Sequence, residues 1–230
     1  MIIETCPLLD DIPWIRHGFF GKENPYAAVK KLSGLHRFSH AFPQVLYLKQ
    51  THTDNVITEI DEVDAEADAF VTHKPDLGLA VKTADCCPIL LVCTATKQIA
   101  AIHAGWRGAL NGITVKAIEK MLARGASPLS LIAAIGPNIH SENYPVQADV
   151  YNAFAIAAPE ALDFLTPFED RWKLDVAGII KQQMARLGVR KIWISEIDTF
   201  SDPRFSSYRQ YQANSLPDLR NVSLILKVNT

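Results

Sequence analysis

The sequence predicts a single α+β domain, residues 1–230, with layered mixed β-sheets flanked by helices. Short apolar runs follow one another closely in the first half of the chain, whereas helical and strand patterns mix in the second half. This order lacks the regular strand–helix alternation of a parallel α/β fold. The chain also shows no internal repeat and no linker rich in Pro, Gly or Ser, so one domain is favoured over two.

The first half reads as a series of strands. The HGFFG run at residues 17–21 is typical of a strand end and turn, and VLYLKQT at 45–51 is rich in β-branched and aromatic residues. The runs ILLVCT and IAAIH are almost wholly apolar, which predicts strands covered on both faces. The strands expected in this half are 45–51, 56–60, 69–72, 78–83, 89–94 and 99–103.

The second half mixes helices and strands. Ile113, Ala117 and Met121 fall at helical spacing, and Gly125 and Gly188 suit the position after a helix C-terminus. The elements expected in this half are helices 110–124, 147–157 and 176–187 and strands 131–135, 191–197 and 222–228.

Composition excludes several classes of protein. The chain is 48% hydrophobic and 21% charged, which is ordinary for a globular protein and excludes disorder and collagen-like repeats. Its net charge is -2, without the basic surplus of a phosphate-backbone binder, so we expect no nucleic-acid partner. Residues 1–9 lack the basic start of a signal peptide, and no apolar run reaches about 18 residues. We therefore expect no membrane association and a cytoplasmic location.

Three of the four cysteines lie within eight positions. A secreted disulfide scaffold spreads its cysteines and uses more of them, so the group Cys86, Cys87 and Cys93 indicates another role. Cys87 and Cys93 fit small buried hydrophobic residues at or on the following strand. Cys6 carries no assignment.

Three potential metal ligands lie where predicted strands end or begin. His52 follows one strand, Cys86 lies between two apolar strands, and His103 ends the run IAAIH. Two His and one Cys suit Zn²⁺ with a fourth position left for water or substrate, the catalytic arrangement. Their separations of 34 and 17 residues match no compact zinc-finger motif, so spacing alone leaves structural roles open.

Four segments resemble the YfiH family: QTHTDNV at 50–56, TADCCPILL at 83–91, HAGWRG at 103–108 and IGPNI at 135–139. The resemblance continues in IDTFS and FSSYRQ and runs in order from about residue 17 to the end. Members of this family have been called laccase-domain proteins, multicopper polyphenol oxidases, purine nucleoside phosphorylases and peptidoglycan editing factors. The resemblance implies a layered fold of mixed sheets and helices.

The resemblance also implies a metal site and an activity. The family's zinc ligands fall on His52, Cys86 and His103, and Cys86 is preferred over Cys87 because it directly follows Asp. The implied function is a zinc-dependent enzyme whose substrates are purine nucleosides and phosphate. The implied reactions are phosphorolysis of adenosine, inosine, guanosine or methylthioadenosine, and deamination of adenosine.

Five further residues are candidates for that chemistry. Deamination needs a metal-bound water and a carboxylate that moves protons, and Asp85 is nearest in sequence, although a turn or a hydrogen bond to a ligand His would explain it equally. Phosphorolysis needs cationic groups that donate hydrogen bonds to phosphate, such as Arg107, although a structural ion pair would also explain this residue. Lys49 and Lys82 are additional substrate-binding candidates. Trp106 could stack a purine or simply join the core.

The chain departs from the family pattern at four places. An Arg-Gly-Gly-x-Ser-like stretch is replaced at residues 21–25, and Tyr-Glu-Val becomes Tyr144-Pro145-Val146. Arg-Arg becomes Arg209-Gln210, and Thr-Gly-Arg becomes Ser215-Leu216-Pro217. These departures put substrate choice and catalytic efficiency in question and leave the metal ligands intact.

Three alternative functions stay open. The first is a copper-dependent polyphenol oxidase, with copper in place of zinc because Cu²⁺ binds such ligands more strongly. Several coppers are disfavoured, since the chain has seven His and no His-x-His pair. The second is a hydrolase with Cys86 as nucleophile and His103 as base, including one that edits peptidoglycan precursors. The third is a metal-binding module without enzymatic activity.

Overall fold

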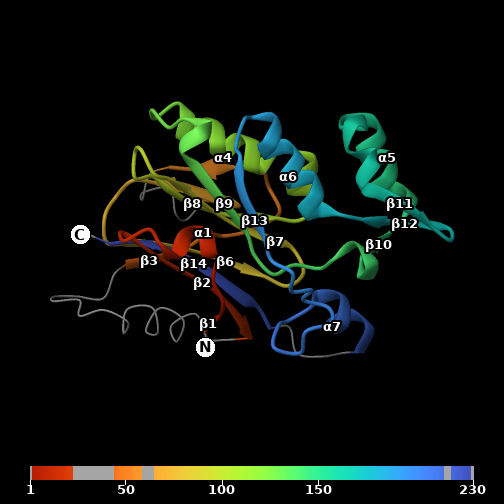
Figure 1. The fold of residues 1–230 in the computed structure, drawn as a ribbon. Coiled ribbons are helices and arrows are strands. Elements are labelled where there is room, and N and C mark those ends of the chain that lie inside the picture. The colour runs from red at the N-terminus through yellow and green to blue at the C-terminus, as the bar shows by residue number, and fades with distance from the viewer. Residues whose placement is uncertain (1, 23–43, 59–64, 215–218, 229–230) are drawn as a thin grey trace.

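Two β-sheets pack face to face in the computed structural model, and helices cover the outer face of one of them (Figure 1). The structure describes residues 2–22, 44–58, 65–214 and 219–228. Part of the predicted strand 56–60, and the family departures at 23–25 and 215–217, lie outside these described residues.

The strands are β1 (Ile2–Glu4), β2 (Ile15–Lys22), β3 (Gln44–Tyr47), β4 (Val56–Ile57), β5 (Ala69–Thr72), β6 (Leu77–Thr83), β7 (Cys87–Cys93), β8 (Ile99–Ala104), β9 (Leu131–Ile135), β10 (Pro145–Val146), β11 (Leu165–Phe168), β12 (Arg171–Leu174), β13 (Lys191–Ile194) and β14 (Asn221–Lys227). The α-helices are α1 (Pro7–Asp10), α3 (Trp106–Leu110), α4 (Ile113–Leu122), α5 (Ala148–Ala157), α6 (Val176–Arg186) and α7 (Tyr208–Asn214). Short 3-10 turns are η2 (Pro128–Ser130), η3 (Ser141–Asn143) and η4 (Pro159–Phe164).

Both large sheets contain parallel and antiparallel neighbours. The five-stranded sheet has the order β1-β2-β14-β6-β3, in which β14 is antiparallel to β2 and β6 while β3 is parallel to β6. The six-stranded sheet has the order β13-β9-β7-β8-β5-β4, in which β13 is parallel to β9 and β4 is parallel to β5. The predicted α+β fold with mixed sheets flanked by helices is therefore confirmed.

The six-stranded sheet separates two apolar cores. Leu90 faces the five-stranded sheet and packs in a cluster with Phe19 and Ile225. Ile89 and Leu91 point to the opposite face, where the helices α4 and α6 cover the sheet. All seven residues of β7 are buried, which agrees with the prediction of a strand covered on both faces.

The prediction of one continuous helix at 110–124 is wrong, both in where the helix begins and in its lack of a break. The chain forms two helices instead, because Gly112 adopts a left-handed φ of 71° between α3 and α4. The first helix begins at Trp106, so Arg107 lies in a helical turn rather than in a loop before the helix. Gly125 and Gly188 have φ of 87° and 86° after their helices, as predicted.

The sequence patterns missed the smallest elements. β10, β12 and β11 form a three-stranded sheet that stands with α5 at one side of the molecule (Figure 1). Each of these strands has two to four residues and lacks an apolar run like that of the predicted strand 69–72, so the hydrophobic pattern did not mark them. The helix α7 was also missed, and the predicted strand 191–197 ends at Ile194.

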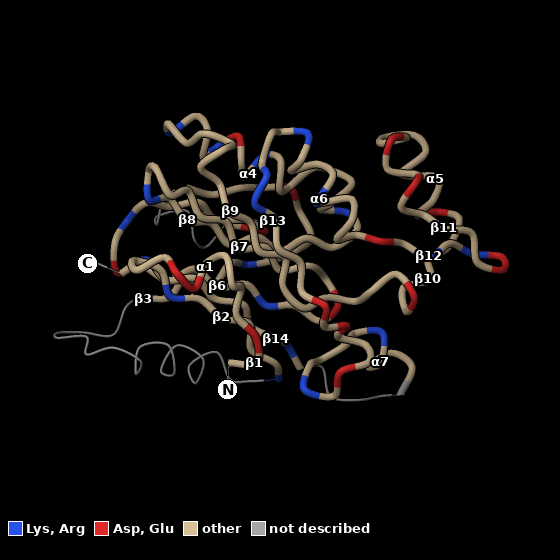
Figure 2. The backbone as a smooth tube through the Cα atoms, viewed as in Figure 1, with Lys and Arg blue, Asp and Glu red and all other residues tan. Residues whose placement is uncertain are grey.

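Charges of both signs are interspersed along the chain (Figure 2). Attraction of an anion would therefore depend on local groups rather than on the field of the whole molecule. Among the helices that the structure describes, none combines the length and apolar character needed to cross a bilayer.

Candidate metal centre and cleft

Two strands of the six-stranded sheet and the segment between β3 and β4 bring two His and one Cys together. His52 follows β3 in a left-handed conformation with φ of 61°, Cys86 lies directly before β7, and His103 lies at the end of β8. β7 and β8 are antiparallel, so the start of one strand lies beside the end of the other. The Cys86 Sγ lies 3.8 Å from the His52 Nε2, and the three ligand atoms all lie within 4.8 Å of one another.

A buried carboxylate that the sequence analysis did not select organises this group. Asp68 is fully buried, and its Oδ1 lies 2.7 Å from the Nδ1 of His103. The same carboxylate accepts hydrogen bonds from the backbone N–H groups of Thr51, His52 and Thr53 and from the Thr53 hydroxyl. Asp68 therefore fixes the orientation of His103, with the Nε2 left for a metal, and shapes the loop that carries His52.

The Cys86 sulfur is suited to bind a metal as thiolate. Burial raises the pKa of this thiol, but the positive charge of His103 and hydrogen bonds from His103 and His52 outweigh burial and hold the pKa at about 6. Burial alone lowers the pKa of His103, but Cys86 and Asp68 raise it to about 9. For the neighbouring Cys87, burial raises the thiol pKa well above its ordinary value. The geometry thus joins Cys86, rather than Cys87, to the two histidines.

The donor set fits a divalent metal such as Zn²⁺. One sulfur and two imidazole nitrogens converge from three segments of the chain, and a His held by a carboxylate is a usual supporting arrangement for a zinc ligand. Three protein ligands leave a fourth position for water or substrate, as in catalytic rather than structural zinc sites.

Gly105 packs directly against this site, and its position leaves no room for a side chain. A Cβ at this position would lie 3.0 Å from the Cys86 Sγ and 3.2 Å from the His52 Cδ2. We expect Gly105→Ala to weaken Zn²⁺ affinity about tenfold by displacing the ligands, as measured by competition with a chelating dye. Gly108→Ala is the matched control, since its methyl would meet Ile113 at 3.2 Å and would approach His103 only at its backbone oxygen, at an ordinary contact distance of 3.7 Å. Equal zinc affinity in both variants would contradict this prediction.

A cleft of about 750 Å³ opens over the three ligands. The five other residues selected from the sequence line this cleft: Lys49, Lys82, Asp85, Trp106 and Arg107. The Arg107 guanidinium lies 4.3 Å from the ring centroid of Trp106. The Lys82 ammonium lies 5.8 Å from the ring centroid of Tyr47, and the Lys49 ammonium lies 2.9 Å from a Glu66 carboxylate oxygen.

Asp85 lies in the cleft wall, and its carboxylate is engaged by the protein. Oδ1 accepts a hydrogen bond from the Thr199 hydroxyl at 2.8 Å. Oδ2 accepts from the Ser207 hydroxyl at 3.0 Å and from the Arg209 backbone N–H at 2.8 Å. Only 7% of the surface of this residue is exposed. The burial and the three hydrogen bonds favour a structural role for Asp85 over proton transfer.

The cleft also contains aromatic and cationic residues that the sequence analysis did not select as site residues. Tyr144, Tyr208, Arg209 and Arg220 line it. Tyr144 and Arg209 belong to two of the four segments where the chain departs from the YfiH pattern, and those departures were the signal that could have pointed to them. The structure thus supplies arginines to the cleft despite those departures.

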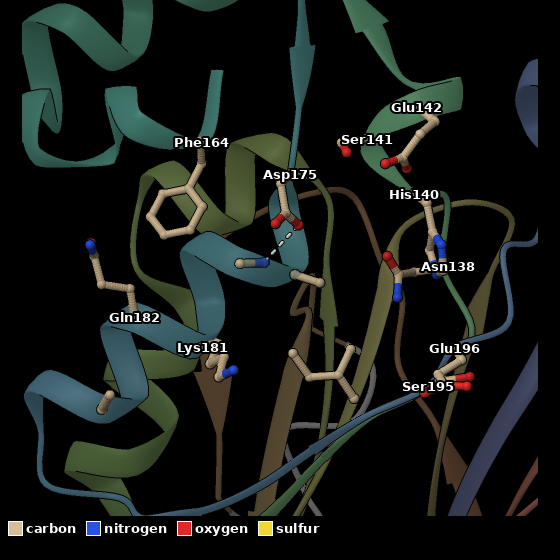
Figure 3. Close-up of a pocket in the computed structure, with 14 residues that line it drawn as sticks. Asn138, His140, Ser141, Glu142, Phe164, Asp175, Lys181, Gln182, Ser195 and Glu196 are labelled. Atoms are coloured by element: carbon tan, nitrogen blue, oxygen red, sulfur yellow. Dashed lines mark hydrogen bonds between the residues drawn. The ribbon is translucent and has the colours of Figure 1, made fainter. Parts of the chain in front are cut away.

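A second pocket of about 710 Å³ lies beside α6 and is lined by the loop at residues 138–142 (Figure 3). Its Asp175 accepts a hydrogen bond from the backbone N–H of Gly178 at 2.8 Å and thereby caps α6. Within the described parts of the chain, the only group of three metal-binding side chains is His52, Cys86 and His103. The first cleft is therefore the candidate functional site.

The fold and this site define an α+β protein of mixed sheets with a candidate His–Cys–His metal site. Residues 22–225 match the family model described as "multi-copper polyphenol oxidoreductase laccase". The chain belongs to this family, the YfiH family whose segments it resembles.

Curated relatives carry a different name. A protein named purine nucleoside phosphorylase from Corynebacterium glutamicum is 36% identical over 173 residues, covering 73% of this chain and 69% of that protein. One of the same name from Deinococcus radiodurans is 37% identical over 164 residues, covering 71% of this chain and 63% of that protein. The chain thus spans about two thirds of these relatives' lengths.

Solved structures share the fold. A Neisseria meningitidis protein described as DUF152 superposes with a TM-score of 0.75 and 28% identity, covering 90% of this chain and 83% of that one. The Bacillus licheniformis hypothetical protein YfiH superposes with a TM-score of 0.80 and 23% identity, covering 94% of each chain. The likeness to this second structure concerns the fold alone.

Proposed function

We propose that this chain is a zinc-dependent purine nucleoside phosphorylase that also deaminates adenosine. The observation that supports it is an open three-ligand metal site at the base of a cleft lined by Trp106 and Arg107. The names of the curated relatives favour phosphorolysis over other reactions of such a site. His52, Cys86 and His103 would hold the Zn²⁺.

The cleft residues divide between the two substrates. Arg107 offers guanidinium donors to phosphate, and the indole of Trp106 offers a flat apolar surface to a purine. Lys82 would add positive charge to the cleft, whereas Lys49 would do so only on leaving its ion pair with Glu66. A bound Zn²⁺ would supply a Lewis acid and, for deamination, a water of lowered pKa.

The same proposal places the enzyme, as one domain, in the cytoplasm. All four cysteines are free in the structure, which suits a reducing compartment. A thiolate metal ligand of this kind is also better preserved where thiols stay reduced.

Incubation with purine nucleosides tests the proposed function. With adenosine and phosphate we expect adenine and ribose 1-phosphate together with inosine, and without phosphate inosine alone, all identified by chromatography and mass spectrometry. Protein stripped of metal by a chelator is the control, and added Zn²⁺ should restore both reactions. A complete lack of product from adenosine, inosine, guanosine and methylthioadenosine would refute the proposal.

A copper oxidase is the second candidate, favoured by the description of the family model. Metal analysis of protein purified without added metals separates the two. Zinc near a stoichiometry of about one per chain supports the nucleoside enzyme. Stoichiometric copper together with oxidation of a phenol would support the oxidase.

A further inference from the structure

The residue before the Cys ligand anchors the C-terminal segment that closes one wall of the cleft. Asp85 binds Thr199, Ser207 and the backbone of Arg209 through its two carboxylate oxygens. Because Asp85 adjoins Cys86 in the chain, these bonds fix residues 199–209 relative to the metal site. Among the three residues that bond to Asp85, Arg209 is the one with a cationic side chain.

The Arg209 side chain is held in place without being neutralised by a salt bridge. Its Nη1 donates a hydrogen bond to the Pro145 carbonyl oxygen at 3.0 Å, and its guanidinium carbon lies 5.1 Å from the ring centroid of Tyr144. Among the described residues, no carboxylate oxygen lies within 4.0 Å of this guanidinium. A guanidinium has five N–H donors, so several are left for a ligand in the cleft.

Arg107 repeats this arrangement elsewhere in the same cleft, where its guanidinium stacks on Trp106. Each arginine is thus ordered by an aromatic ring and lines the metal cleft. A guanidinium ordered in advance loses little side-chain entropy when it binds, and its planar fork matches two phosphate oxygens. Two such groups in one cleft indicate a ligand with a compact, doubly charged anion.

We propose that Arg209 binds the phosphate co-substrate and that Asp85 is the positioning residue that sets Arg209 in the cleft. This inference rests on the proposed phosphorylase function. In that reaction a hydrogen phosphate oxygen forms a bond to the ribose C1′ while the bond from C1′ to the purine nitrogen breaks. The electron pair stays with the purine, which takes the proton of hydrogen phosphate. Arg209 holds the attacking phosphate and balances its charge.

Phosphate kinetics of Arg209 variants test the first half of this inference. For Arg209→Met we expect the phosphate KM to rise about tenfold or more, with the nucleoside KM within about twofold of wild type. Arg209→Lys should recover part of the loss. Arg204→Met is the matched control, because Arg204 lies in the same segment and pairs with Asp202 outside the cleft. An unchanged phosphate KM in Arg209→Met would overturn the assignment.

Calorimetric titration with inorganic phosphate separates this inference from the proposed function. Suppose that wild-type protein forms no product but binds phosphate, and that Arg209→Met loses this binding. This outcome would refute the proposed reaction and support the phosphate site. Product formation with phosphate binding unchanged in Arg209→Met refutes the site and supports the reaction.

The positioning role of Asp85 has its own test. Asp85→Asn should raise the phosphate KM about as much as Arg209→Met while the metal content and the nucleoside KM stay unchanged. If Asp85→Asn folds poorly, Thr199→Val replaces it in the test. This variant removes one of the hydrogen-bond donors to Asp85 and should raise the phosphate KM by a smaller factor. A large fall in kcat at saturating phosphate, with the phosphate KM unchanged, would show instead that Asp85 acts on the substrate.

Discussion

Replacing Cys86 with Ser is expected to remove the metal and, with it, both proposed reactions. The Ser hydroxyl stays protonated where the Cys86 thiol, with its pKa near 6, ionises, so only two imidazoles would remain as ligands. The zinc content measured by plasma mass spectrometry should fall from about one zinc per chain to a small fraction of that amount. Thermal unfolding of the variant, compared with metal-stripped wild type, shows whether the fold persists.

Cys87→Ser is the matched control for this prediction. Cys87 is the next residue, but its side chain packs into the core beneath α4 and α6 and its thiol pKa is raised by burial. We expect this variant to lose stability by about 1 kcal/mol and to keep its zinc. Zinc lost from Cys87→Ser and retained in Cys86→Ser would reverse the assignment of the ligand.

Alkylation of the thiols distinguishes a metal ligand from a catalytic nucleophile. In metal-stripped protein, iodoacetamide should modify Cys86 first, since the other three cysteines are buried. Added Zn²⁺ should protect Cys86 if the thiolate is a ligand. A Cys86 that reacts equally with zinc bound would favour the cysteine hydrolase named among the alternatives.

The three candidate metal ligands could be selected from the sequence because they lie near strand ends, within segments that resemble one family. His103 ends an apolar strand and Cys86 lies between two others, which made both of them candidates. Their spacing left structural roles open, and the resemblance to the YfiH family completed the choice. Asp68 could not be selected in this way. It lies 16 residues after His52 and 35 before His103, and its role depends on the pairing of β5 with β8. That pairing is long-range, and no local pattern encodes it.

The cleft wall shows the same limit. Arg209 and Tyr144 meet across 65 residues, on elements too short to leave a periodic pattern. The predicted helix began at residue 110, after Arg107, because the apolar spacing of α4 determined where the helix was expected. The break at Gly112 leaves no trace in that spacing. Local periodicity thus predicts the buried strands well and the irregular segments that complete the site poorly.

Asp68→Asn is expected to weaken metal binding without removing a ligand. The Asp68 carboxylate lies beside the His103 ring nitrogen and accepts hydrogen bonds from the N–H groups of the His52 loop. An amide keeps one acceptor oxygen and places an NH₂ donor against groups that already donate, so at least one buried partner loses its bond. We expect Zn²⁺ affinity to fall about 10–100-fold and the free energy of unfolding to fall by about 3 kcal/mol.

Glu66→Gln is the matched control, because Glu66 lies two residues away and forms an exposed pair with Lys49. Its zinc affinity should equal that of wild type, since an exposed ion pair contributes little. Thr53→Val is the graded variant, which removes only the hydroxyl bond to Asp68 and should give a smaller loss. Zinc affinity unchanged in folded Asp68→Asn would mean that β8 alone orients His103. The buried carboxylate would then serve only the stability of the loop, and metal affinity would depend on the three ligands themselves.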